Sequence, residues 1–317
     1  MVGTESSAHR AVTFDAMTMV PYDELGLFHE NAAEFGLPYD APPVVRREAV
    51  EVAPGRHLSA LVWGEATPEL VLLHGGAQNA HTWDTVAMAL GRPLVAIDLP
   101  GHGHSDAPGN GTLDLRSNAD DVATAIRALA PEAKAIVGMS LGGLTTLAVA
   151  DAHPDIARKV VLVDVTPTVE GAGAAAIMAF VNGPESFADF DELLARTIEF
   201  NPTRSESSLR RGILHNALQR EDGSWVWRYR RFTDEAEAGE RTIPGEELWD
   251  AVSRLTVPLM LVRGMRNGSV VDDTSEGMLV ERQPSARIEH VEEAGHSVQG
   301  DDPLRLADLL VDFVFGD

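Results

Sequence analysis

The chain has 317 residues, of which 44% are hydrophobic and 23% are charged, and its formal net charge is −24. This composition excludes a disordered chain, and the negative charge disfavours binding to nucleic acid or to anionic membrane surfaces. The chain contains no cysteine, which excludes disulfides, thiolate nucleophiles and cysteine metal sites.

The N-terminal segment carries no targeting signal that we recognise. It lacks both the basic start and the apolar stretch of a signal peptide. The longest apolar run, residues 172–181, is too short to span a bilayer. We therefore expect a soluble, cytoplasmic protein with no membrane partner.

Residues 1–45 form an N-terminal extension that precedes the regular pattern. Part of it, residues 23–40, predicts a short helix, because apolar side chains recur near one face of it at Leu25, Phe28, Ala32 and Phe35. This extension is our candidate region for subunit contacts in a homo-oligomer.

A regular α/β pattern follows and defines the predicted core, residues 46–166 and 251–317. After two strand-like stretches, apolar strands alternate with helix-like segments. This is typical of a parallel sheet covered by helices on both faces. The apolar strands are expected at residues 69–75, 93–100, 133–140, 158–165, 257–264 and 286–292.

The alternation is interrupted by residues 167–250, which we interpret as an inserted helical cap. Trp225 and Trp227 alternate along a short stretch and therefore share one face of an extended strand. Most aromatic residues of the insertion are expected to form its own core. The candidates for lining an apolar substrate pocket are Met178, Phe180, Trp225 and Trp227.

The strongest chemical signal is the sequence Gly-Met-Ser-Leu-Gly-Gly at residues 138–143. It ends a predicted strand and begins a predicted helix. In that setting a G-x-S-x-G sequence forms a tight turn that exposes the serine oxygen above the sheet. The alternative is a glycine-rich turn with an incidental serine, and the flanking strand and helix favour a nucleophile at Ser140.

Two further motifs carry the partners of such a serine. His74-Gly75-Gly76 ends a strand, where one backbone N–H of an oxyanion hole is expected from Gly76 and the other from Leu141. Gly295-His296 follows the last predicted strand, so His296 has the chain order of a general base.

Four motifs together, HGG, DLPGHGHSD, GMSLGG and EEAGHS, resemble the α/β-hydrolase superfamily. The resemblance covers about residues 45–165 and 255–317. It implies a mostly parallel sheet with a cap, Ser140 as nucleophile, His296 as base, and the N–H groups of Gly76 and Leu141 as oxyanion donors. A serine at this turn implies acyl transfer, and we expect neither a cofactor nor a metal ion.

The chain departs from the family pattern where the acid of the triad is expected. Relatives carry an aspartate about three residues after the glycine at position 264, but this chain has Asn267. An amide cannot be the charged partner of the histidine. Asp164, at the end of a neighbouring strand, is the preferred candidate, and Asp272 and Asp273 are the alternatives.

These features predict a serine hydrolase that acts on an ester or lactone of an apolar, uncharged small molecule. A weaker resemblance, in the cap and the displaced acid, is to bacterial lactonases that open the macrolactone zearalenone. A C–C bond hydrolase acting on a vinylogous diketone shares every motif. A non-catalytic ligand-binding relative is the third hypothesis, with Asn267 as the mark of a decayed triad.

Overall fold

The central feature of the computed structural model is an eight-stranded sheet; the model describes residues 19–109, 114–168, 172–201, 204–230 and 245–316. The strand order is β1-β2-β4-β3-β5-β6-β10-β11. β1 and β2 pair antiparallel, as do β2 and β4, and all other neighbours are parallel. The strands are β1 (Val45–Ala53), β2 (Arg56–Trp63), β3 (Leu70–Leu73), β4 (Leu94–Ile97), β5 (Ala135–Met139), β6 (Val160–Val163), β10 (Leu259–Gly264) and β11 (Arg287–Val291).

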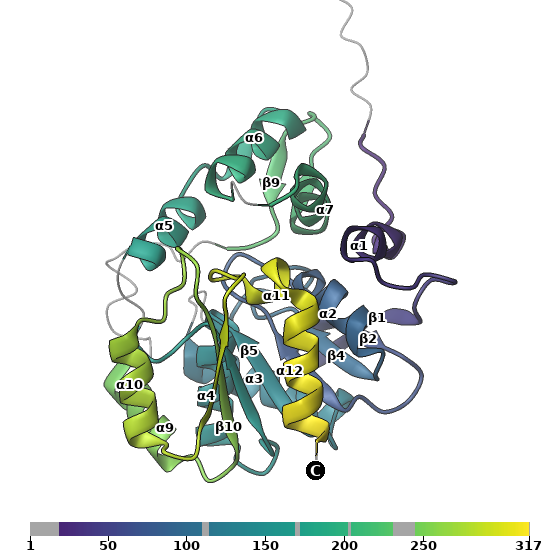
Figure 1. Ribbon diagram of the computed structural model, residues 1–317. Coiled ribbons are helices and arrows are strands. Elements are labelled where there is room, and N and C mark those ends of the chain that lie inside the picture. Colours follow the sequence, from purple (N-terminus) through teal and green to yellow (C-terminus); the bar gives the residue numbers. More distant parts are fainter. Residues whose placement is uncertain (1–18, 110–113, 169–171, 202–203, 231–244, 317) are drawn as a thin grey trace, which may run out of the picture.

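Helices cover both faces of this sheet (Figure 1). One apolar core joins the sheet to α3 (Leu115–Leu129), α4 (Leu141–Ala152) and α9 (Gly245–Arg254), with α10 (Asp273–Arg282) packed beside α9. The other joins the sheet to α2 (Asp84–Leu90) and α12 (Pro303–Phe315). The predicted α/β-hydrolase architecture is confirmed.

The central strands are short and apolar along their whole length. Every residue of β3, β4 and β6 is buried. A strand that is covered on both faces needs apolar side chains at successive positions, not at alternate ones. This is why the sequence shows apolar runs, and why the strand positions were predictable.

The segment between β6 and α9 contains α5 (Ala172–Val181), α6 (Phe190–Phe200) and α7 (Glu206–Asn216). We refer to its described part, residues 172–230, as the cap. It also contains a three-stranded antiparallel sheet that we did not predict, in the order β7-β9-β8. Its strands are β7 (Ser186–Phe187), β8 (Ala217–Gln219) and β9 (Trp225–Trp227).

The predicted end of the insertion at residue 250 needs correction. Helix α9 already begins at Gly245, and its residues Leu248, Trp249 and Val252 belong to the core beneath α4. The apolar face of α9 is therefore buried against α4 of the core, not within the cap. Residues 231–244, which we had also assigned to the insertion, lie outside the described residues.

The described part of the N-terminal extension lies between the cap and the core. Helix α1 (Phe28–Phe35) packs against α2, and the Phe28 ring lies 5.0 Å from the ring of Trp63. Just before it, Val20 and Tyr22 pack against the apolar core of the cap. Residues 19–35 thus contact both parts of the molecule.

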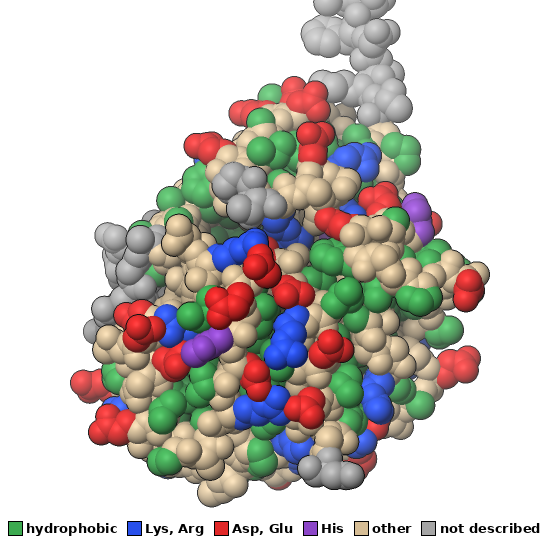
Figure 2. All heavy atoms as spheres, viewed as in Figure 1, with side chains coloured by type: hydrophobic (Ala, Val, Ile, Leu, Met, Phe, Trp, Pro, Cys, Tyr) green, Lys and Arg blue, Asp and Glu red, His purple; other side chains and the backbone are tan. Residues whose placement is uncertain are grey.

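On the face seen in Figure 2, acidic and basic side chains are interspersed, without a continuous basic area. No helix in the described part of the chain is both long and apolar enough to cross a membrane.

Candidate active site

Ser140 lies in a sharp turn between β5 and α4, with backbone angles φ 51° and ψ −119°. The turn brings backbone segments so close that side chains do not fit. A Cβ at Gly138 would lie 2.3 Å from the Gly142 oxygen, and one at Gly142 would lie 2.3 Å from the Leu73 oxygen. The glycines of the motif are therefore required by packing, and they hold Ser140 at the carboxyl edge of the sheet.

Backbone strain is concentrated at this edge. Among the described residues, three that are not glycine have positive φ: Ala77 at 59°, Ser140 at 51° and Asp164 at 46°. They follow β3, β5 and β6, which are neighbours in the sheet. A left-handed backbone costs a non-glycine residue of the order of 1–2 kcal/mol, and such strain is typical of functional sites.

Asp164 and His296 are brought together by β6 and the loop after β11. The His296 Nδ1 lies 2.9 Å from an Asp164 carboxylate oxygen. The Asp164 side chain is fully buried, and the His296 side chain is 11% exposed. Because an ionised carboxylate can only accept hydrogen bonds, it holds the proton on Nδ1 and leaves Nε2 free to accept one.

The loop that lacks the family's aspartate supports the Asp164 carboxylate instead. The Gly264 N–H donates to it at 2.9 Å, the Ser269 hydroxyl at 2.6 Å and the Val270 N–H at 3.0 Å. With His296, four donors satisfy this buried group. Buried carboxylates are stable only when they are bonded in this way.

The alternative acids have other partners. Asp272 is the N-terminal capping residue of α10 and accepts from the Ser275 N–H at 2.7 Å. Asp273 pairs with Arg263, and its side chain is 95% exposed. Asn267 is exposed. None of the three makes a hydrogen bond to His296 in the described structure.

The predicted oxyanion donors lie at the same edge. Within the described part of the chain, no acceptor binds the N–H of Gly76 or of Leu141. Between the described residues Ser140 and His296 no direct hydrogen bond is formed, and such contacts often tighten only when substrate binds. The His74 side chain has a structural role: it bonds the Gly75 oxygen at 2.7 Å and accepts from the Leu99 N–H at 2.9 Å.

The cap residues proposed to line a pocket have different surroundings. Trp225 is buried in the cap's own core, 5.1 Å from the Phe190 ring. Phe180 and Trp227 pack together, with their ring centres 5.7 Å apart, against a cluster that includes Ala77. Met178 is 42% exposed. Phe180 and Trp227 are thus the two candidates that lie close to the segment bearing Gly76.

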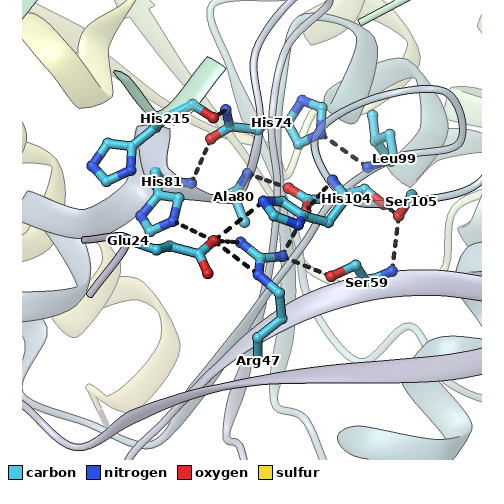
Figure 3. A network of polar contacts seen from close by, with 12 residues as sticks. Glu24, Arg47, Ser59, His74, Ala80, His81, Leu99, His104, Ser105 and His215 are labelled. Carbon is cyan, nitrogen blue, oxygen red and sulfur yellow. Dashed lines mark hydrogen bonds and ion pairs between the residues drawn. The ribbon is translucent and has the colours of Figure 1, made fainter. Parts of the chain in front are cut away.

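Figure 3 shows a buried polar cluster that the sequence did not indicate. Glu24 of the extension bonds Arg47 and His81, and His81 Nδ1 lies 2.8 Å from Asp84. His215, at the end of the cap helix α7, stacks on His81. These residues come from four distant segments, and no local motif connects them.

The pKa values of the two stacked histidines are shifted in opposite directions. Burial by itself lowers the pKa of His81, but Asp84 and then Glu24 outweigh it and raise this pKa to about 9. Burial, together with the positive charge on His81, lowers the pKa of His215 well below its usual value. At neutral pH the pair is therefore one imidazolium stacked on one neutral imidazole.

His81, Asp84 and His215 also place potential metal ligands within 4.8 Å of one another. The two imidazole rings are stacked, with centres 3.7 Å apart and 12° between their planes. A ring nitrogen binds a metal close to the plane of its ring. Nearly parallel rings cannot both direct a nitrogen at one ion without rotating, so the geometry fits an ion pair better than a metal centre.

The raised pKa of His81 predicts a pH-dependent stability. Its contribution is fully present below the unfolded-state pKa near 6.5 and is lost as pH rises through about 9. The unfolding free energy of the parent should fall between pH 7 and pH 10, because His81 loses its proton. In His81→Gln this fall should be smaller by roughly 2–3 kcal/mol. Urea unfolding at both pH values measures this.

The matched control is His29→Gln, which changes an exposed histidine of α1. Its unfolding free energy should follow that of the parent at both pH values. If His81→Gln and the parent lose the same stability between pH 7 and pH 10, His81 is not charged in the folded protein.

Comparison with known proteins agrees with this geometry. A model of the alpha/beta hydrolase family matches residues 70–309. The chain is 43% identical over 302 residues to the esterase Rv0045c of Mycobacterium tuberculosis, covering 91% of this chain and 94% of the relative. It is 30% identical over 258 residues to a pimeloyl-[acyl-carrier protein] methyl ester esterase of Aeromonas hydrophila, covering 78% and 95%.

A solved structure of the M. tuberculosis esterase shares the fold closely. Its TM-score with this chain is 0.81 at 38% identity, and the match covers 93% of this chain and 100% of that one. The family match spans most of the sheet and includes Ser140, Asp164 and His296. The chain belongs to the alpha/beta hydrolase family.

Proposed function

We propose that the protein is a serine hydrolase that cleaves a carboxylic ester or lactone of an apolar, uncharged small molecule. The observation that carries this proposal is the strained Ser140 at the same sheet edge as the buried Asp164–His296 pair. The two relatives named above are both esterases, which supports ester hydrolysis as the reaction.

In the proposed first half-reaction, the Ser140 oxygen attacks the carbonyl carbon and its proton moves to Nε2 of His296. The negative charge that develops on the carbonyl oxygen accepts hydrogen bonds from the N–H groups of Gly76 and Leu141. Asp164 remains ionised and stabilises the imidazolium. The C–O bond then breaks, and the departing alcohol takes the proton from His296.

The second half-reaction releases the acyl group from Ser140. Water attacks the acyl-enzyme while His296 accepts its proton, and this proton then returns to Ser140 as the carboxylic acid leaves. With a lactone the alcohol stays attached to the acyl chain, so one hydroxy acid is the only product.

The apolar, uncharged character of the substrate is inferred from the surroundings of Ala77. The cluster around it contains Val181 and Tyr229, with Phe180 and Trp227 packed against them. Apolar and aromatic side chains usually provide most of the contact area in small-molecule sites. The net charge of −24 also disfavours an anionic substrate.

We expect nitrophenyl butyrate to be hydrolysed about tenfold or more faster, in kcat/KM, than the charged nitrophenyl hemisuccinate. The same panel should contain simple lactones, zearalenone and a vinylogous diketone, each with Ser140→Ala as the control. Cleavage of the diketone alone would instead identify a C–C hydrolase. A lack of turnover and of probe labelling at Ser140 would identify a non-catalytic binding protein.

A further inference from the structure

The residues Gly75 to Gln78 form a tight turn that contains the proposed oxyanion donor Gly76. The Gln78 N–H donates to the Gly75 oxygen at 3.2 Å, which closes the turn. Ala77, at its third position, has φ 59°, whereas φ of Gly76 is not positive. This is the pattern of a type II turn, whose third position favours glycine because φ there is positive. Alanine in that place stores strain.

The strained Ala77 is held from both sides. Its N–H donates to Nε2 of His102 at 3.2 Å, and its oxygen accepts from the Asn216 side-chain amide at 2.7 Å. His102 belongs to the core, in the loop after β4, whereas Asn216 is the last residue of the cap helix α7. The cap therefore reaches the turn directly.

The Asn216 side chain is itself fixed in orientation. Its oxygen accepts from the Asn79 amide at 3.1 Å, and the same Asn79 amide bonds the His215 oxygen at 3.0 Å. The Asn79 oxygen in turn accepts from the His81 N–H at 2.9 Å. Because the Asn216 oxygen is occupied by Asn79, its NH₂ group must face Ala77.

Apolar contacts strengthen this connection. Ala77 is 7% exposed and packs in one cluster with Val181 of α5 and with Tyr229. The Tyr229 ring also lies over His102, 6.4 Å between centres. The cap thus contacts the turn in three ways. Asn216 bonds the Ala77 oxygen, Val181 packs on the Ala77 side chain, and Tyr229 lies against His102, which accepts the Ala77 N–H.

We propose that Asn216 is a positioning residue, through which the seated cap holds the oxyanion turn in its strained, catalytic geometry. Without this hydrogen bond, the peptide between Gly76 and Ala77 can flip to relieve the strain. The flip breaks the bond from the Ala77 N–H to His102 and changes ψ of Gly76 and φ of Ala77. The turn then no longer fixes the adjacent peptide, which carries the Gly76 N–H. An oxyanion donor is effective only when it is fixed in place before the reaction. This inference rests on the proposed function.

The test is Asn216→Ala, assayed per active site titrated with a fluorophosphonate. We expect kcat to fall about 10- to 100-fold with KM within about threefold of the parent, because the oxyanion exists only in the transition state. The matched control is Asn201→Ala. Asn201 is also the residue at the end of a cap helix, but among the described residues its amide bonds only Thr197 of the same helix. It should retain the parental kcat.

A second substitution separates positioning from a loss of structure. Ala77→Gly removes the strain at the third position of the turn. The loss caused by Asn216→Ala should therefore be smaller in the Ala77→Gly background, by about threefold or more. A purely structural role of Asn216 predicts the same loss in both backgrounds and a lower melting temperature.

The outcomes distinguish this inference from the proposed function. If Ser140→Ala is fully active, the proposed function is wrong. If Ser140→Ala is inactive but Asn216→Ala keeps its kcat within twofold of the parent, only the positioning role is wrong. An equal loss in Asn201→Ala would also overturn it.

Discussion

Replacement of Ser140 by alanine should lower kcat by about 10⁴- to 10⁶-fold, the range seen when the nucleophile of a serine hydrolase is removed. The reason is that no other hydroxyl occupies the strained turn above the sheet at this point, so the acyl-enzyme cannot form. Steady-state kinetics on nitrophenyl butyrate measures the loss, and mass spectrometry after fluorophosphonate treatment should locate the label on Ser140 of the parent.

The control for this variant is Ser253→Ala. Ser253 is an exposed residue of α9, and its hydroxyl bonds the Trp249 oxygen of the same helix. It should keep parental activity and be labelled at Ser140. Full activity of Ser140→Ala, or a label on another residue of the parent, would contradict the role given to Ser140.

Replacement of Asp164 by asparagine should reduce kcat by as much as about 10⁴, by analogy with the corresponding change in serine proteases. The substitution keeps the shape of the side chain but removes the charge that stabilises the imidazolium of His296. The Gly264 and Val270 N–H groups donate to opposite oxygens of the carboxylate. Whichever way the new amide turns, its NH₂ group faces a backbone donor.

Because that conflict also reduces stability, the variant must first be shown to be folded by circular dichroism and by its melting temperature. Two controls follow from the geometry. Asp273→Asn alters an exposed carboxylate, and Asn267→Ala alters an exposed amide; each should change kcat by less than about tenfold. A folded Asp164→Asn with near-parental turnover, together with an inactive Asp272→Asn or Asp273→Asn, would place the acid after β10.

The sheet could be predicted because each strand is marked by a pattern within its own few residues. Apolar runs mark the buried strands, and the glycines around Ser140 are required by the close approach of α4 to β3. The position of Asp164 beside His296 could also be anticipated, because parallel strands end at a common edge. The choice between the three acids could not be made from spacing alone.

The cap and the extension were less predictable because their contacts are long-range. The strands β7 and β8 have two and three residues, too few for a recognisable pattern. The alternation of Trp225 and Trp227 indicated the extended strand β9 but not its partners. The sequence of α9 does not distinguish it from the helices of the cap, and only the contact of its apolar face with α4 assigns it to the core. The bond from Asn216 to Ala77 joins residues 139 positions apart, and a single asparagine carries no sequence signal.

The position of the acid has a consequence for how this scaffold can be altered. In relatives with the later acid, the loop after β10 is constrained by catalysis. Here its tip, residues 265–268, is exposed, and only Gly264, Ser269 and Val270 contact Asp164. Residues 265–267 are therefore open to diversification in engineered libraries, whereas Gly268, with φ 102°, must stay glycine. Conversely, Asp164 stands just ahead of the cap, so an exchange of caps between homologues must place its junction after this residue, or the graft will remove the acid along with the old cap.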